Sequence, residues 1–328
     1  MAVMLVAINS ALSFLARHAM TAMVGAVFLG LVAPSMAALL NPLLAPSVWL
    51  LLVVSLLRIN PEDSAQHIRR PWRIGGLLIW SLVITPAAMF AIVSLFDLPA
   101  GIAGAMVLAA GSSPLISTPA LALLMGLDGA MVLLVMLTST LLVPLTLPGV
   151  ALVLLGLEMD VGASELMARM AALVGSAILT TMILRRVYGT QPFCRIGNQL
   201  DGTVVFLLIV FAVAIMDGLT ARLLAEPGFV FFVMALTFAA YIGLMVATIL
   251  MLSIFAPKWG KRVILSVGFA AGCRNLAVIL AVLPAGVDPD MIMYFAVGQF
   301  PIYIMPAVMK PIMLRLVADE PISGDGSN

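Results

Sequence analysis

The chain has 328 residues, of which 63% are hydrophobic and 9% are charged, whereas an ordinary globular domain is about half apolar and about a quarter charged. Long apolar segments recur along the whole sequence, which indicates a polytopic helical membrane protein and excludes a soluble fold. The residue alternation of outer-membrane barrel strands is absent. The two cysteines and two histidines lack ligand spacing, so we expect no disulfide framework, no metal site and no cofactor.

Charges, prolines and glycines divide the sequence into ten expected membrane spans. The spans run near 18–40, 46–59, 73–96, 100–126, 128–156, 164–184, 202–221, 227–256, 262–285 and 289–316. The span near 46–59 is short and can take residues from its neighbours. Residues 1–17 are apolar without the basic start of a secretory signal, which predicts an interfacial segment. The polar end of the chain predicts a disordered tail over 317–328.

The basic residues lie mainly in the connections on one side of the expected spans. That side holds twelve of the 16 Lys and Arg residues, whereas the other side holds Arg169 and Arg222 together with most of the acids. The twelve are Arg17, Arg58, Arg69, Arg70, Arg73, Arg185, Arg186, Arg195, Lys258, Lys261, Arg262 and Arg315. Because basic connections stay in the cytoplasm, both termini are expected there, in the inner (plasma) membrane of a bacterium.

The two halves of the chain resemble each other. The segment GLDGAMVLLV (126–135) and the segment GVDPDMIMYF (286–295) align at an offset of 160 residues. Five spans per half is an odd number, so the second half enters the membrane in the opposite direction. This pattern predicts two inverted five-helix repeats over 18–156 and 157–316, with a binding site where interrupted helices meet.

The fourth expected span is interrupted by the sequence GSSPLISTP (111–119). Proline removes a backbone donor and disfavours helix in the residue before it. One half-helix should therefore end near Ala110, and a second should begin near Thr118, whose hydroxyl can cap the helix ahead of Pro119. Ser112, Ser113, Ser117 and Thr118 can satisfy the unwound backbone. A simple proline kink is the alternative.

The ninth span is interrupted at the matching place by GCRN (272–275). Gly272 can end one half-helix and Asn275 can open the next, which leaves Arg274 in an apolar run near the positive end of a helix dipole. Arg274 can bind a carboxylate, sulfonate or phosphate of a substrate, or it can cap the carbonyl groups of the half-helix that crosses it. The two roles are compatible. Cys273 is expected to be a small packing residue.

Other polar residues lie inside the spans, and most membrane Ser and Thr side chains only bond their own helix backbone. Ser81 and Thr85 belong to the third span, Ser139 and Thr140 to the fifth, and Gln299 to the tenth. The candidate substrate-binding residues are Arg274, Asn275, Ser112, Ser113, Ser117, Thr118, Ser139 and Gln299. The candidate coupling-ion ligands are Ser117, Thr118, Ser139 and Thr140.

Four stretches of this sequence resemble the bile acid:sodium symporter superfamily. They are LLRINPEDSAQHIRRPWRI (56–74), GSSPLISTPALALLMGLD (111–128), STLLVP (139–144) and GCRNLAVILAV (272–282). The resemblance implies ten helices in two inverted repeats, arranged as a mobile core and a panel with two broken helices that cross. It also implies a secondary transporter that carries organic anions by alternating access.

The sequence departs from the superfamily at the sodium ligands that the resemblance implies. The family's Ser-Asn pair falls on Thr118 and Pro119, with Ser117 as a substitute, and two hydroxyl ligands fall on Val132 and Met136. The family's Glu falls on Ala270, its second-break Gln on Arg274 and its third-span Gln on Ser81. Sodium requires several oxygen ligands. We therefore expect Arg274 to replace the cation, with transport as a uniport, an exchange or a proton-linked process.

Two other classes of function compete with a carrier. A membrane-embedded enzyme would need a nucleophile with a base or a metal motif such as His-Glu-x-x-His, and the sequence contains none. An anion channel stays open as an alternative, because arginine can line an anion pore.

Overall fold

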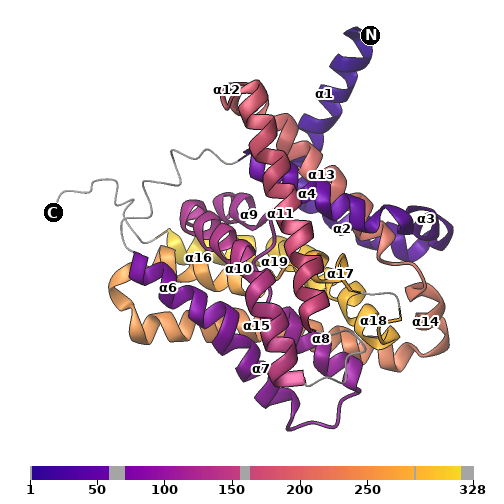
Figure 1. Ribbon diagram of the computed structural model, residues 1–328, viewed down its shortest axis with the longest axis vertical. Coiled ribbons are helices and arrows are strands. Elements are labelled where there is room, and N and C mark those ends of the chain that lie inside the picture. The colour runs from indigo at the N-terminus through magenta and orange to yellow at the C-terminus, as the bar shows by residue number, and fades with distance from the viewer. Residues whose placement is uncertain (1, 59–70, 156–162, 284–285, 319–328) are drawn as a thin grey trace.

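The computed structural model is entirely helical, and it describes residues 2–58, 71–155, 163–283 and 286–318 (Figure 1). The helices of the first half are α1 (Ala2–Arg17), α2 (Ala19–Val32), α3 (Pro34–Leu40), α4 (Leu44–Arg58), α6 (Pro71–Ile79), α7 (Thr85–Val93), α8 (Ala100–Ala110), α9 (Thr118–Leu124) and α10 (Gly129–Leu155). Those of the second half are α11 (Ala163–Tyr188), α12 (Gln191–Arg195), α13 (Gly197–Ala214), α14 (Leu219–Ala225), α15 (Pro227–Phe255), α16 (Lys261–Gly272), α17 (Leu276–Leu280), α18 (Pro289–Val297) and α19 (Gln299–Val317). Two short 3₁₀ turns cover Asn41–Leu43 and Pro257–Trp259, and a π-helical turn, η2, covers Trp80–Ile84.

Seven helices of the described chain are long and apolar enough to cross a membrane, or eight if one bent pair counts as a span. The protein is therefore an integral membrane protein with multiple apolar helices. The expected spans near 100–126 and 262–285 are absent from that count because each is interrupted, as the prolines and glycines predicted. α8 and α9 form the first broken span, and α16 and α17 form the second.

The first two expected spans have different boundaries from those predicted. The span expected over 18–40 ends at Val32, and the next continuous span runs from Pro34 to Arg58. Pro34 occupies the first turn of α3, where its missing N–H costs nothing, so it starts a helix there. The short span near 46–59 thus takes residues from its neighbour. The seventh span also ends earlier than expected, at Ala214.

Residues 1–17 were expected to form an interfacial segment, and residues 2–17 form the helix α1. Its residues 9–17 are bent by 93° from α2, and α1 packs along α13. The two helices approach closely at Gly202, where a Cβ atom would lie 2.1 Å from the carbonyl oxygen of Leu12. The tail expected over 317–328 lies outside the described residues from 319 on.

The contact at Gly202 leads to a stability prediction. We expect Gly202→Ala to lower the free energy of unfolding by about 1–2 kcal/mol, because the methyl group displaces the backbone of α1. Gly25→Ala in α2 is the matched control, since nothing lies within 4 Å of its added Cβ atom. Melting temperatures of the purified variants in detergent measure the effect. Equal melting temperatures would show that α1 is not held against α13.

The described helices pack in two groups. α1, α2, α3, α4, α11 and α13 contact one another, and α6 to α10 contact one another and α15 to α19. In Figure 1, α2, α4 and α13 lie across the upper part of the molecule, whereas α6, α7, α8 and α15 lie in the lower part. We call these sets the first helix group and the second helix group. They meet where α10 packs against α11 and where α19 packs against α2.

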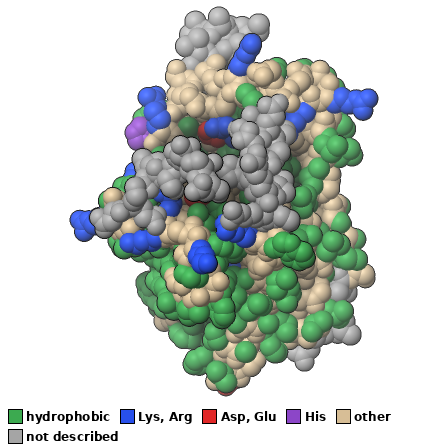
Figure 2. All heavy atoms as spheres, turned by 90° about the vertical axis from the view of Figure 1, so that its left-hand side faces the viewer, with side chains coloured by type: hydrophobic (Ala, Val, Ile, Leu, Met, Phe, Trp, Pro, Cys, Tyr) green, Lys and Arg blue, Asp and Glu red, His purple; other side chains and the backbone are tan. Residues whose placement is uncertain are grey.

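The surface is largely hydrophobic, as contact with lipid requires. Large side chains such as Phe255 and Leu224 are each 80% exposed. Figure 2 shows one face on which hydrophobic side chains cover the lower part while Lys and Arg side chains gather in the upper part. This separation of apolar and basic surface is what a bilayer with a basic cytoplasmic border demands.

Candidate functional site

The two broken spans cross in the middle of the second helix group. The backbone between α8 and α9 meets the backbone between α16 and α17 in an antiparallel bridge that pairs Pro114 with Arg274. We call this place the helix crossing (residues 111–117 and 273–275). Leu115 donates its N–H to the carbonyl of Cys273 at 2.7 Å, and Asn275 donates to that of Ser113 at 2.8 Å. The unwound backbone at this depth is therefore satisfied within the protein.

The hydrogen bonds of the crossing are reciprocal. Pro114 and Arg274 are 160 residues apart, and the same offset relates Leu115 to Asn275 and Ser113 to Cys273. Shifting one of the two bonds by 160 residues therefore produces the other. α8 also packs against α17, and α9 against α16, so the two broken spans run in opposite directions (Figure 1).

The Arg274 guanidinium lies at the end of α8. Its Nη1 donates to Ser81 Oγ at 2.8 Å and to the carbonyl oxygen of Ser112 at 2.6 Å, and its Nη2 donates to Thr85 Oγ1 at 3.2 Å. Thr85 in turn donates to the carbonyl of Ala110, the last residue of α8, at 2.9 Å. Arg274 thus caps the carbonyl end of the crossing half-helix, which is the structural role considered for it. A cation is favourable at this end of a helix dipole.

The hydroxyl groups that hold Arg274 flank a π-helical turn. The turn η2 separates α6 from α7, with Ser81 inside the turn and Thr85 directly after it. π turns in α-helices occur frequently at functional sites, because the inserted residue changes which side chains face inward. Here both hydroxyl groups face the same guanidinium.

Several polar atoms at the helix crossing are buried without a hydrogen-bond partner. Nε of Arg274, Nδ2 of Asn275 and Oγ of Ser117 have none, and Oγ1 of Thr118 has no oxygen or nitrogen partner, although the thiol of Cys273 lies near it. A buried polar group in a native protein usually has a partner, so each exception calls for an explanation such as a water, an ion or a ligand. Four of the seven such atoms among the described residues belong to the crossing.

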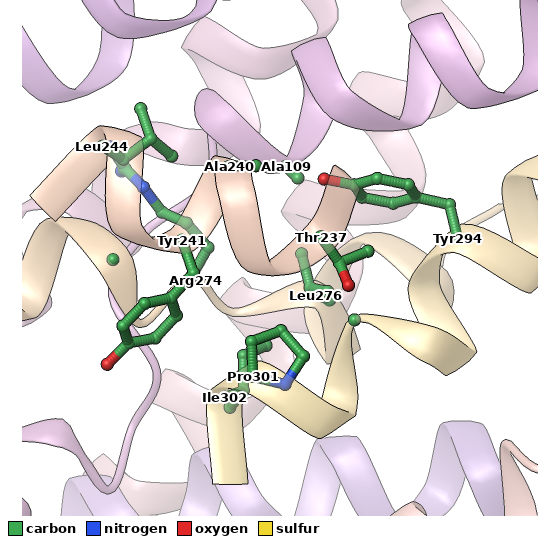
Figure 3. Close-up of a pocket in the computed structure, with 12 residues that line it drawn as sticks. Ala109, Thr237, Ala240, Tyr241, Leu244, Arg274, Leu276, Tyr294, Pro301 and Ile302 are labelled. Atoms are coloured by element: carbon green, nitrogen blue, oxygen red, sulfur yellow. The ribbon is translucent and has the colours of Figure 1, made fainter. Parts of the chain in front are cut away.

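A small cavity adjoins Arg274. Its volume is about 30 Å³, which has room for about two water molecules. Figure 3 shows Tyr241 and Arg274 on one side and Tyr294 on the other, with the Tyr294 hydroxyl directed toward Ala109 and Ala240. The wall residues come from α8, α15, α16, α17, α18 and α19, and most of them are apolar.

The structure brings some of the predicted site residues together and leaves others apart. Arg274, Asn275, Ser112 and Ser113 meet at the crossing. Ser139, Thr140 and Gln299 are buried, but they donate to carbonyl groups of their own helices, at Val135 and Met136, at Met136, and at Phe295 respectively. These three therefore show the self-satisfied bonding that most membrane Ser, Thr and Gln side chains adopt.

The predicted cap of α9 was wrong by one residue. Ser117, not Thr118, precedes the first helical residue, and its side chain accepts no capping bond. Ser117 has helical dihedral angles, which places Pro119 at the second helical position instead of the first. The cap predicted for α17 was confirmed, because Asn275 Oδ1 accepts from the N–H of Val278 at 3.4 Å. The ends predicted at Ala110 and Gly272 were also confirmed.

The turns after the two breaks match each other. Gly126 and Gly286 both have positive φ, at +72° and +97°, which a side chain would strain. The aspartates that follow two residues later both accept backbone hydrogen bonds at the start of the next helix. Asp128 accepts from Met131 at 2.9 Å and Asp288 from Asp290 at 2.8 Å.

Sequence reasoning did not place Ser81, Thr85, Tyr241 and Tyr294 in the site. Ser81 carried a signal, because it stands where the resembled superfamily has a glutamine that approaches the second break. Thr85 lies four residues later and shares its helix face. Tyr241 is 160 residues after Ser81, and its hydroxyl lies 3.0 Å from the Cys273 sulfur. The internal repeat therefore held a signal for Tyr241, whereas Tyr294 had none.

A sequence model of the Sodium Bile acid symporter family matches residues 45–226, which is more than half of the chain and includes the first broken span. No curated protein matches the chain. The structure agrees with the family match, since it has several membrane-spanning helices and a broken span within the matched residues. The chain belongs to the sodium bile acid symporter family and is a membrane transporter of that family.

Proposed function

We propose that this transporter carries a small organic anion, with a carboxylate or sulfonate group, by alternating access and without sodium. The observation that supports the proposal is Arg274, a guanidinium that is 3% exposed and lies at the crossing of the two broken helices. Three of its five N–H donors are used by Ser81, Ser112 and Thr85, and Nε is without a partner. The remaining donors can bind an anion that reaches the site.

The residues at the positions of the family's sodium ligands do not fit sodium. Ala270, Val132 and Met136 offer only hydrocarbon or thioether groups, whereas sodium needs several oxygen ligands. The oxygen atoms that remain nearby are Ser81 Oγ, Thr85 Oγ1 and the Ser112 carbonyl, and all three already accept from Arg274. The guanidinium thus takes the oxygen atoms that a mobile cation would use, and it supplies the positive charge itself.

The proposed architecture has ten spans in two inverted repeats, over 18–156 and 157–316. Adding the two broken spans to the eight continuous or bent spans brings the number to ten. The reciprocal bonds of the helix crossing support the repeat, because a two-fold axis makes residue i contact j whenever j contacts i. The matching Gly and Asp turns at 126–128 and 286–288 support the same offset. The positive-inside rule puts both termini in the cytoplasm of a bacterial cell.

Alternating access requires two parts that move relative to each other. The first helix group corresponds to the panel of the superfamily and the second helix group to the mobile core. The cavity beside Arg274 is too small for an organic anion in this conformation, since it has room for about two waters. Substrate entry therefore requires the two groups to separate, as expected for a carrier and not for an open anion channel.

Uptake of organic anions into proteoliposomes tests this proposal. We expect wild-type uptake to be the same with and without sodium, and Arg274→Gln to reduce it by more than about tenfold, the loss of one charge-assisted hydrogen bond. Arg169→Gln is the matched control, because Arg169 pairs with Glu165 on the surface. Strong sodium dependence of the wild type would contradict the proposal.

Two additional measurements separate binding from folding. Ser81→Ala removes one oxygen from the guanidinium while the charge stays, so we expect uptake to remain. The melting temperature of each variant shows whether the crossing is intact. Saturable uptake without unitary currents would distinguish the carrier from the anion channel, and an intramembrane enzyme would need a catalytic motif that the sequence lacks.

A further inference from the structure

Arg274 is the only charged side chain among the buried residues that the structure describes. All three oxygen atoms that accept its hydrogen bonds are neutral. No described carboxylate forms an ion pair with it, since the described ion pairs involve Arg58, Arg169 and Arg222. A guanidinium stays protonated in proteins. The helix crossing therefore has a net charge of +1 that no described side chain balances.

We infer that the protein is an obligatory exchanger of monovalent anions, which reorients with one anion bound and returns only with another. This rests on the proposed function, because it assumes that the anion binds at Arg274 and that the second helix group moves. The bound anion makes the crossing neutral. Without an anion, the same movement carries an unbalanced charge through the apolar interior.

The size of this difference determines the mode of transport. A charge at the centre of a bilayer is disfavoured by a factor of roughly 100 relative to a neutral group, even on the insertion scale that gives the smallest value. The empty carrier should reorient more slowly by a factor of that order. Net uptake requires the empty carrier to return, whereas exchange does not. Exchange is therefore much faster than net uptake.

The single positive charge also selects the valence of the substrate. A monovalent carboxylate or sulfonate cancels the guanidinium charge, so exchange of two such anions moves no net charge. A divalent anion would leave a charge of −1 at the crossing and would meet the same barrier as the empty carrier. The hydroxyl groups of Ser81 and Thr85 donate or accept hydrogen bonds but cannot alter this balance.

The charge moves with the second helix group. The oxygen atoms that hold Arg274 belong to η2, to α7 and to the segment after α8, all within that group. The bonds of the helix crossing join the same elements. The guanidinium thus has no described contact with the first helix group that could leave it behind during reorientation.

The test measures uptake of labelled taurocholate, methanesulfonate and pyruvate by proteoliposomes with wild-type protein. One lumen contains the same anion unlabelled, a second contains sulfate as its only anion, and a third contains chloride. We expect uptake to be at least about tenfold faster into the first lumen than into the second, and exchange to change by less than about twofold under a potassium diffusion potential. Fast uptake into the chloride lumen would support exchange with a small inorganic anion as the counter-substrate.

The outcomes separate this inference from the proposed function. Equal uptake into the first and second lumens would show a uniport, which overturns obligatory exchange but leaves anion transport standing. Uptake of none of the three anions into any lumen would overturn the proposed function and the inference with it. Exchange that is accelerated strongly by voltage would show that the loaded site is not neutral, which contradicts the inference alone.

Discussion

Replacing Ser81 by aspartate is expected to reduce anion uptake by at least about 100-fold, because an internal carboxylate then occupies the guanidinium. Ser81 Oγ lies 2.8 Å from Nη1 of Arg274, so an aspartate here forms a direct ion pair with it. Two unit charges about 4 Å apart interact with about 4 kcal/mol at an effective dielectric constant of 20. A substrate anion must overcome an attraction of that order to bind Arg274.

Ser81→Asn is the matched control for this prediction. Asparagine has the same size as aspartate and can accept the hydrogen bond of Nη1, but it has no charge, so uptake should stay within about tenfold of the wild type. The melting temperature of Ser81→Asp should exceed that of Ser81→Asn, since it balances a buried charge. Equal uptake by both variants would limit Arg274 to capping α8, and the substrate would then bind elsewhere.

Reversing the charge of Asp290 is expected to produce the largest loss of stability outside the helix crossing. Asp290 accepts from Arg222, and the two side chains are 21% and 27% exposed. The pair joins α14 to the first turn of α18, and Thr220 of α14 donates to the carbonyl of Leu31 in α2 at 2.6 Å. Asp290→Arg should lower the free energy of unfolding by about 2–3 kcal/mol, between the values for exposed and buried pairs.

The double variant Arg222→Asp/Asp290→Arg tests whether the effect comes from this pair. Exchange of the two charges should restore part of the melting temperature that Asp290→Arg loses, because the attraction returns in the reversed sense. Recovery is incomplete since Glu226, 3.8 Å from Arg222, then faces a second carboxylate. Additive losses in the double variant would show that the two side chains do not stabilise the fold through each other.

Local chemistry was enough to predict the ends of the broken helices. Pro114 and Pro119 cannot continue a helix, Gly272 ends one readily, and Asn275 accepts the backbone bond of a helix start, so these positions follow from residue type. The boundary between the first two spans was wrong because Pro34 is compatible with a kink inside a helix and with a helix start. Packing of the neighbouring helices, and not composition, decides between the two.

The partners of Arg274 could not be predicted in the same way. A charge in an apolar run, at an offset of 160 residues from Pro114, was enough to mark position 274 as a site. Its two possible roles, binding an anion and capping a helix, differ only in what surrounds the guanidinium. Ser81 and Thr85 are 193 and 189 residues away in the chain, and the π turn η2 orients them. Residue types and their spacing thus determined the spans, the breaks and the buried charge, because these depend on local backbone chemistry and hydrophobicity. The oxygen atoms that receive the charge depend on contacts between distant helices, which exist only once the chain has packed.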